Sequence, residues 1–431
     1  MRPLEESVVR LLTKERAAAG GGFLLDEHRI LSSVDSVARA LGLESAPVEP
    51  PEGSVRLDFP LAPRERLASA RVILWRPAAG EADALGNLAV LGLDAEARDA
   101  GRAAAVRAPA DDHYDVVMDA ISDGELVPFF GAGVNLCGRP RDAAWKRGQY
   151  LPSGAELSAY LAREFRYPGP DKYDLVRVSQ YVALMRGLGP LNNRLRHVFN
   201  DDYPPTSLHK FFATLPDVLR RKGYPPYQLI VTTNYDDVLE RAFREAGEAF
   251  DLITYVVGGG QEQRGKFLHW LPDGEVRLIE KPNEYRLPLD EKRHLQRPVI
   301  LKIHGAIDRA TPGPQPPPRD SFVITEDHYI DYLTRSDISN LVPVTLAEKL
   351  QGSSFLFLGY KLRDWNLRVI LHRIWMRQQD ANYKSWAIQL EPEELEQEYW
   401  KKRDVEIFNA RLEDYIAKLG RRLEGLPGAG D

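Results

Sequence analysis

The sequence after residue 112 alternates between short apolar runs and long amphipathic segments, and this pattern constrains the fold more than any other feature. The runs are ELVPFFG, YQLIVTTN, FDLITYVV, PVILKIHG, SSFLFLGY and KSWAIQL, and we expect helices over residues 156–165, 173–185, 237–246 and 365–375. Strands that alternate with helices build a parallel sheet with helices on its faces. The pattern therefore predicts an α/β domain over residues 112–431.

The residues before about position 105 show a different pattern. The runs GGFLLD, RILSSV, SVRLDFPL, ARVILWRP and NLAVLGL are separated by turn residues, which predicts a small β unit. The following segment ARDAGRAAAVRAPADD is alanine-rich and charged, as expected of a connection between domains. A chain of 431 residues is also too long for one ordinary core. We therefore expect a small β-rich domain over residues 1–105, followed by the α/β domain.

The composition argues against several classes of protein. No run approaches the ~18 apolar residues of a membrane span, and the start MRPLEESVVRLL lacks the apolar core of a signal peptide. The one cysteine, Cys137, cannot form a disulfide framework or a zinc site built on cysteine pairs. A net charge of -6 gives no overall attraction to nucleic acid or anionic membranes. We expect a cytoplasmic protein with no direct nucleic-acid or membrane binding.

Glycine or polar residues follow four of the predicted strands at the point where each strand ends. They are the GAG turn of residues 131–133, then Asn234 with Asp236, then His304, and then a second glycine turn at Gly359. Ligands bind at the carboxyl ends of parallel strands in open α/β sheets. Each feature alone also has a structural explanation, because Asn and Asp cap helices and a single histidine is often a core residue. Their occurrence at four strand ends of one sheet favours a ligand site.

The order and identity of these residues resemble the sirtuin-like (silent information regulator) family, whose sheet binds NAD. The GAG turn matches the phosphate turn of the family, TTNYD at 232–236 lies where the family has a T-x-N-x-D stretch, and His304 with Gly305 matches its catalytic His-Gly. The segment LFLGYKLRDWNLR is similar to that of bacterial defence-associated members. The resemblance extends from about residue 112 to about residue 420 and implies a Rossmann-like parallel sheet with helices on both faces.

The resemblance also implies a set of site residues. The catalytic residues would be His304, Asn234 and Asp236. The residues that would bind NAD are Gly131, Ala132, Gly133, Val134, Asn135, Thr233, Tyr235, Gly305, Gly359 and Tyr360. A histidine titrates near neutral pH and suits a proton acceptor, whereas Asn234 can hold the ribose and orient a water. Asp236 would either anchor the nicotinamide carboxamide or cap the following helix, and Asp364 is expected to act as a helix cap.

The sequence departs from deacetylating sirtuins in its cysteine content. Those enzymes carry a zinc module held by four cysteines, whereas this chain has one cysteine, Cys137, just after the GAG turn, so no zinc is expected. The implied activity is hydrolysis of NAD to ADP-ribose and nicotinamide, by a regulated effector of bacterial anti-phage defence. The alternatives are a non-catalytic sensor or scaffold subunit that binds NAD or ADP-ribose and, less favoured, an NAD-dependent protein deacylase.

Residues 15–100 show a weaker resemblance to the first half of a trypsin-like serine protease. The position of the catalytic histidine is occupied by Asp35 and that of the catalytic aspartate by Asn87, and the chain has no GDSGG segment for the serine. Because peptide hydrolysis by this type of protease needs all three groups, we expect a catalytically inactive half-barrel. It would serve sensing, docking or assembly, in a homo-oligomer or with a protein partner that triggers activity.

Overall fold

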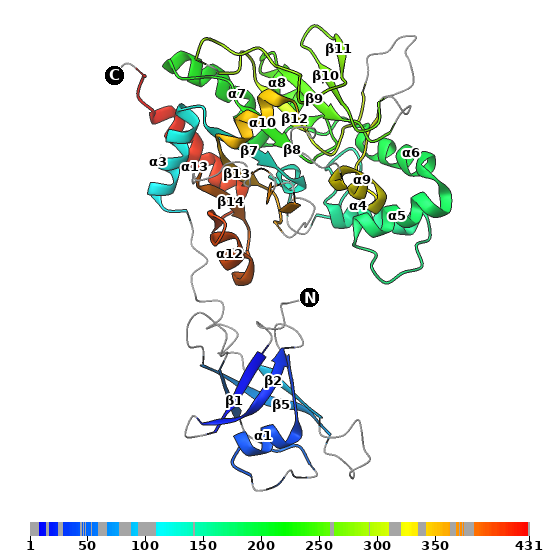
Figure 1. Ribbon diagram of the computed structural model, residues 1–431, viewed down its shortest axis with the longest axis vertical. Helices are drawn as coiled ribbons and strands as arrows, with labels where there is room; N and C mark the ends of the chain where they lie inside the picture. The colour runs from blue at the N-terminus through cyan, green and yellow to red at the C-terminus, as the bar shows by residue number, and fades with distance from the viewer. Residues whose placement is uncertain are drawn as a thin grey trace. The chain divides into compact units, whose positions relative to one another are not determined.

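A computed structural model of the chain divides into two compact units, Met1–Val106 and Arg107–Asp431 (Figure 1). The structure describes residues 8–13, 17–24, 29–43, 45, 47, 49–52, 54–58, 67–76, 88–93, 109–140, 143–258, 263–292, 294–309, 320–334, 342–362, 368–369, 371–372, 374 and 383–429.

The first unit is a closed antiparallel barrel with the strand order β1-β2-β3-β6-β5-β4. Its strands are β1 (Val8–Leu12), β2 (Ala18–Leu24), β3 (Arg29–Ser32), β4 (Ser54–Asp58), β5 (Leu67–Arg76) and β6 (Leu88–Leu93). All five predicted runs form strands, whereas β1 was not predicted. Apolar side chains from the strands meet inside the barrel, where Leu11, Ile30, Leu57 and Leu91 are fully buried. Closure pairs every strand on both edges.

A short helix in the first unit, α1 (Val34–Ala40), begins directly after β3. The Ser33 side chain caps it by accepting a hydrogen bond from the backbone N–H of Ser36 (3.2 Å). Asp35, where the trypsin-like resemblance puts the protease histidine, is exposed in the first turn of this helix. Asn87 lies outside the described residues. The barrel therefore presents Asp35 as a solvated helix residue.

The second unit is built on a nine-stranded sheet with the order β11-β10-β9-β12-β8-β7-β13-β14-β15. The strands are β7 (Leu126–Phe130), β8 (Leu229–Thr232), β9 (Asp251–Tyr255), β10 (Phe267–Trp270), β11 (Val276–Ile279), β12 (Val299–Lys302), β13 (Ser354–Leu358), β14 (Ser385–Gln389) and β15 (Val405–Asn409). From β9 to β15 all neighbours are parallel, which confirms the predicted parallel sheet. The antiparallel hairpin of β10 and β11 at the edge was not predicted.

Helices cover both faces of this sheet, as predicted (Figure 1). One face packs on α3 (Asp111–Ser122), α7 (Ser207–Lys222), α8 (Val238–Glu245) and α13 (Leu412–Gly425), and the other on α10 (Val344–Gln351) and α12 (Glu394–Lys401). Successive residues of a strand point to opposite faces of the sheet. In β12, Ile300 packs on the α8 face and Leu301 packs on the α10 face. The predicted helix over residues 365–375 lies partly outside the described residues.

A third hydrophobic cluster joins α4 (Gly154–Glu164), α5 (Leu175–Arg186) and α6 (Leu188–Phe199) to the residues after β8 and β12. The predicted capping box of α4 is present, with Ser153 Oγ accepting from the Glu156 N–H and Glu156 accepting from the Ser153 N–H.

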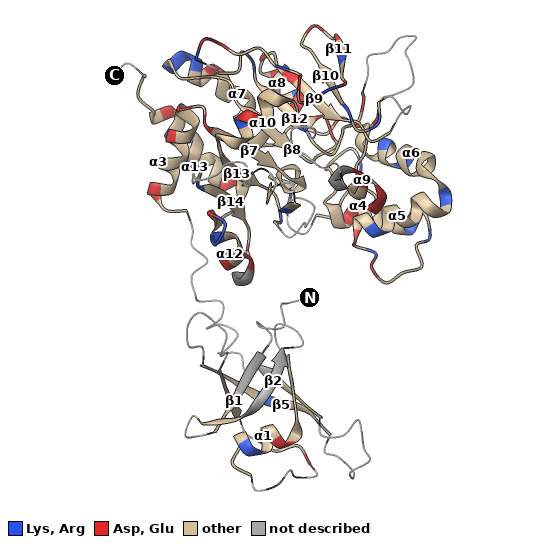
Figure 2. Ribbon diagram, in the orientation of Figure 1, with Lys and Arg blue, Asp and Glu red and all other residues tan. Residues whose placement is uncertain are grey.

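A further helix, α9 (Glu326–Thr334), lies between β12 and α10 in the chain. Basic and acidic residues are interspersed over the helices of this unit (Figure 2).

The strand order reverses between β7 and β13. The chain leaves β7 for β8 on one side and later returns to place β13 on the other side. This is the topological switch point at which open α/β sheets bind ligands. The four strands whose ends carry the glycine and polar residues, β12, β8, β7 and β13, are consecutive neighbours across it. The fold therefore brings the four sequence features to one stretch of the sheet edge.

Candidate active site

The glycine turns after β7 and β13 pack against each other, backbone to backbone. The Gly131 N–H donates to the Leu358 carbonyl (3.0 Å) and the Gly133 N–H donates to the Gly359 carbonyl (2.9 Å). A Cβ atom on Gly133 would lie 2.7 Å from the Cα atom of Gly359, and one on Gly131 would lie 2.5 Å from the Tyr360 ring. The contact between the turns therefore requires glycine at both positions, a reason that the sequence did not reveal.

One side of the turn after β7 remains open to solvent. Ala132 is exposed and Gly133 and Asn135 are half-buried, whereas Val134 is fully buried in the cluster beneath the turn. The side-chain oxygen Oδ1 of Asn135 is buried and accepts no hydrogen bond from the described residues. The accessible part of the turn is thus short and made mostly of backbone.

Asn234 connects the end of β8 to this turn. Its side-chain amide donates to the Gly131 carbonyl (3.2 Å), and its backbone N–H donates to the Thr232 hydroxyl oxygen (3.0 Å). The N-cap position of α8 belongs to Asp237, which makes no side-chain capping bond. Asn234 therefore does not cap the helix, and its half-buried side chain lies beside the glycine turn.

Asp236 is buried, with 4% of its surface exposed. Oδ2 accepts from the Asn135 side-chain amide (2.8 Å) and Oδ1 accepts from the Val238 N–H (3.1 Å) at the start of α8. Burial raises the pKa of Asp236, and the positive charge of Lys302 and the hydrogen bond from Asn135 oppose this rise. Of the two predicted roles, the structure shows the bond at the helix start, and the contact with nicotinamide stays a prediction.

His304 follows β12 by two residues and is 4% exposed. Its carbonyl accepts from the Val323 N–H (2.9 Å), and its ring meets the edge of the Tyr329 ring at 5.4 Å between centroids. Gly305 has a φ of 83°, and a Cβ atom there would collide with the Ser321 carbonyl oxygen. The backbone around His304 is therefore held in one position, and only glycine can follow the histidine.

The remaining predicted NAD-binding residues differ in where their side chains lie. Tyr235 packs in the third cluster, and its hydroxyl donates to the Val323 carbonyl (2.6 Å). Tyr360 packs against Phe129 in the cluster on the α10 face of the sheet. Both tyrosine rings thus serve packing. Thr233 is half-buried beside Asn234. Asp364 lies outside the described residues.

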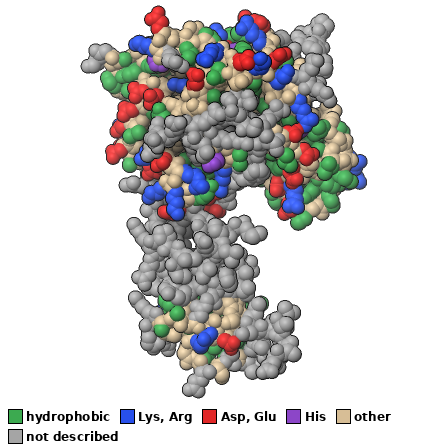
Figure 3. Space-filling view, in the orientation of Figure 1, with side chains coloured by type: hydrophobic (Ala, Val, Ile, Leu, Met, Phe, Trp, Pro, Cys, Tyr) green, Lys and Arg blue, Asp and Glu red, His purple; other side chains and the backbone are tan. Residues whose placement is uncertain are grey.

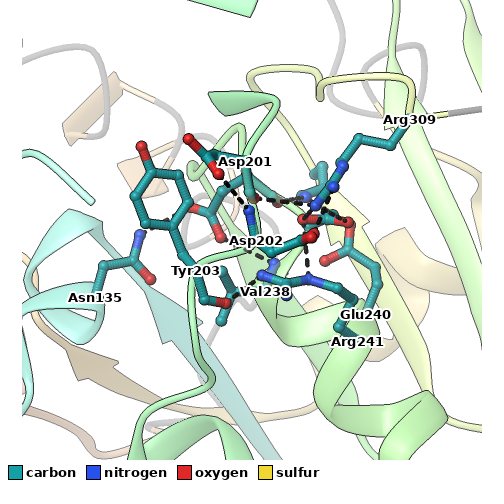
Figure 4. Close-up of polar contacts among 11 residues, drawn as sticks. Asn135, Asp201, Asp202, Tyr203, Val238, Glu240, Arg241 and Arg309 are labelled. Carbon is teal, nitrogen blue, oxygen red and sulfur yellow. Dashed lines mark hydrogen bonds and ion pairs between the residues drawn. The ribbon is translucent and has the colours of Figure 1, made fainter. Parts of the chain in front are cut away.

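Two sets of ionic contacts around the start of α8 were missed by the sequence reasoning (Figure 4). The Lys302 Nζ atom lies 2.6 Å from Glu240 Oε1, with 1% and 2% of the side chains exposed. Arg309, which is partly buried, joins Asp237 (3.3 Å) to the exposed Asp202 (2.6 Å). The available signal was a lysine inside the apolar run VILKIHG, because a charge in a buried strand needs a partner.

Residues 228–408 match the family model of the SIR2-like domain. Over these residues the chain is similar to the SIR2-like domain. The match includes Asn234, Asp236, His304 and Gly359, and the glycine turn after β7 precedes it. Among described residues of both units, no group of three His, Cys, Asp or Glu side chains could hold a metal ion.

Several known proteins are similar to this chain in sequence. "Defense-associated sirtuin 2" of Bacillus subtilis is 23% identical over 300 residues, which cover 68% of this chain and 24% of that protein. "NAD(+) hydrolase ThsA" of Enterococcus faecium is 26% identical over 266 residues (59% and 41%), and its namesake from Acinetobacter baumannii is 26% identical over 263 residues (60% and 41%). The chain thus spans less than half the length of these relatives.

A solved structure of a Sir2 mutant with a p53 peptide and NAD is also similar. It covers 72% of this chain and 98% of its own, at 13% sequence identity and a TM-score of 0.29. That score is too low to bear on the fold, which rests on the strand order of the sheet itself. No helix in the described parts of the chain is long and apolar enough to cross a membrane.

Proposed function

We propose that this chain hydrolyses NAD to ADP-ribose and nicotinamide. The observation that carries the proposal is the convergence of both glycine turns, Asn234 and His304 at four neighbouring strand ends. The relatives named NAD(+) hydrolase support the same reaction. A binding subunit without turnover would not need a histidine at the end of β12, and this favours the enzyme over the sensor or scaffold.

The chemistry assigns a role to each side chain. Cleavage of the N-glycosidic bond releases neutral nicotinamide and leaves a ribosyl centre of cationic character, which a water molecule captures with loss of a proton. His304 would take the proton from a ribose hydroxyl or from that water. Asn234 would hold the ribose and orient the water without adding a charge. The amide is suited to this because its neighbour, the Gly131 carbonyl, fixes its orientation.

The other residues of the site would bind the rest of the NAD molecule. The accessible backbone of residues 131–135 would lie against the diphosphate, since glycine lets a ligand approach the main chain closely. Asn135 would offer its buried Oδ1 atom, which accepts no bond from described residues, to an N–H or hydroxyl group of NAD. Asp236 would orient Asn135 from behind through the 2.8 Å hydrogen bond.

We also propose a regulated role in bacterial anti-phage defence, because unregulated loss of NAD would kill the host cell. The relative named "Defense-associated sirtuin 2" supports this role. The barrel unit would be a catalytically inactive sensing, docking or assembly module. Exposed apolar side chains at the junction of α5 and α6, where hydrophobic residues gather in Figure 3, favour a homo-oligomer or a protein partner; they include Leu184 (71% exposed) and Met185 (62% exposed).

One experiment separates the candidate functions. The purified full chain is incubated with NAD, with and without an acetylated peptide, and nicotinamide, ADP-ribose and the peptide are followed by chromatography. We expect nicotinamide and ADP-ribose in equal amounts and independent of the peptide. Peptide-dependent release with loss of the acetyl group would identify a deacylase instead. Saturable NAD binding without any product would identify a sensor or scaffold.

A further inference from the structure

Lys302 is the last residue of β12 and lies between hydrophobic layers, with 1% of its surface exposed. Its Nζ atom donates to Glu240 Oε1 (2.6 Å) on α8 and to the backbone carbonyl of Asp236. Glu240 is also buried, and burial raises the pKa of its carboxyl while the charge of Lys302 opposes the rise. The ammonium group thus joins β12 both to α8 and to the turn that precedes α8.

A second hydrogen bond holds the same turn from the other side of His304. The Ile307 N–H donates to the Tyr235 carbonyl (2.8 Å). Residues 302 and 307 therefore bind two consecutive carbonyls, those of Asp236 and Tyr235, and His304 lies between the two donors in the chain. The turn that carries Asn234 is fixed relative to the segment that carries His304. Of the two donors, Lys302 is the one that a substitution can remove.

Stability alone does not explain a lysine at this position. Burying an ammonium and a carboxylate costs desolvation, and packed apolar side chains often replace a buried ion pair with no loss of stability. Ile300 and Leu301, the preceding residues of β12, are apolar and fully buried. An apolar residue at position 302 would pack equally well, but it could not hold a backbone carbonyl. The position therefore requires a donor that reaches the turn before α8.

We propose that Lys302 is a positioning residue that keeps the Asn234 turn and His304 at the separation that catalysis requires. The effect on turnover rests on the proposed NAD hydrolysis, whereas the effect on the turn does not. Lys302 is itself buried and would act through the Asp236 carbonyl. Its loss should lower kcat more than it raises KM for NAD, because the backbone bonds from Gly131 and Gly133 to the turn after β13 do not involve Lys302.

Three variants of the full chain test the proposal. Lys302→Met removes the donor but leaves the Glu240 charge buried, so it can also destabilise the fold. Lys302→Met/Glu240→Met removes both charges and should regain a melting temperature close to that of the wild type. Glu240→Gln is the matched control, because it removes the ion pair and leaves the lysine bonded to the Asp236 carbonyl.

We expect the double variant to lose about 10- to 100-fold in kcat, the effect of a small misplacement of catalytic groups. Amide hydrogen exchange, followed by mass spectrometry, should be about tenfold faster in peptides covering residues 233–238 and unchanged in β14. Glu240→Gln should keep slow exchange in the same peptides. Wild-type exchange and wild-type kcat in the double variant would overturn the proposal. If the wild type itself released no nicotinamide, the proposed function would fail, and the exchange rates alone would still decide the role of Lys302.

Discussion

The barrel and the nine-stranded sheet differ in whether the β-sheet is closed. The barrel pairs each strand on both sides, and its core is filled by apolar side chains from all directions. The sheet stays open, and its consecutive strands β12, β8, β7 and β13 end side by side at a switch point. Polar groups and glycine turns are concentrated at those four ends.

This difference indicates which of the two units can form an active site. In the sheet, main-chain groups and side chains from segments far apart in the chain converge, as the bond from Asn234 to the Gly131 carbonyl illustrates. In the barrel, the one described position of the protease-like pattern is Asp35, which is exposed on α1. The proposed catalysis would therefore belong to the sheet, and the proposed recognition or assembly to the barrel. The following changes test this division.

The largest effect is expected from Asn234→Ala, which should abolish measurable NAD turnover. The structure gives Asn234 no capping bond on α8, and even a lost cap costs only ~1 kcal/mol, so the variant should remain folded. Nicotinamide release and thermal melting by circular dichroism measure the two properties. Asn193→Ala, at an exposed position of α6, is the control. Unchanged activity per folded molecule would remove Asn234 from the catalytic set.

His304→Ala should lower turnover by about 100-fold or more, the usual contribution of a general base, with NAD affinity nearly intact. The reason is that the proposed contacts to the diphosphate come from the glycine turn after β7, which the backbone bonds to Leu358 and Gly359 hold in place. Steady-state kinetics and isothermal titration with NAD measure the two quantities. His197→Ala, an exposed histidine of α6, should behave as the wild type. A folded His304 variant with full activity would contradict the assignment.

Gly133→Ala should separate the two interlocked turns. A Cβ atom 2.7 Å from the Gly359 Cα atom forces the backbone apart, and overpacking of this kind costs about 1–3 kcal/mol. Urea unfolding should show the loss, and NAD binding should weaken with it. Gly189→Ala, where nothing lies within 4 Å of the added atom, is the control and should be neutral or slightly stabilising. Equal stability of the two variants would show that the turns are not in tight contact.

Acidification should destabilise the sheet unit. Burial lowers the pKa of His209 to about 3 and that of His113 to about 4, so both are neutral in the folded state and take up a proton when the chain unfolds below pH 6.5. Each therefore contributes a loss of about 1.4 kcal/mol per pH unit as the pH falls from 6.5 toward its folded pKa. Unfolding by urea between pH 7 and 5 measures the slope. His209→Gln should reduce it, and an unchanged slope would contradict the neutral buried state.

Deletion of residues 1–106 should have the smallest effect on basal catalysis. The sheet unit has its own cores and contains all the proposed site residues, so nicotinamide release should be unchanged or increased. The response to the trigger or the assembled mass, measured by light scattering, should change. The division of labour would be wrong if both stayed the same or if the isolated barrel cleaved peptides.

Much of this division was predictable from the sequence, because strand ends and turn residues are local signals. The runs VPFF, LIVT, VILK and FLFL became the four central strands, and the residues after them lie at one edge of the sheet. The hairpin of β10 and β11 was overlooked although LPDG at 271–274 carries turn residues. The bonds of Lys302 and the contact of Gly133 with Gly359 could not be predicted, because they join segments more than 50 residues apart and depend on the strand order.

The contact between the two glycine turns affects what the GAG motif can indicate in related sequences. Because a side chain at Gly131 or Gly133 would collide with the neighbouring turn, a lineage that lost catalysis would still lose stability if it replaced either glycine. Replacement of Asn234 would cost less stability, because its side-chain amide lies at a half-buried position and makes one bond, to the Gly131 carbonyl. An intact GAG motif would therefore indicate only that the sheet and its two glycine turns are present. Asn234 and His304 would distinguish an active enzyme from related proteins that have lost the activity.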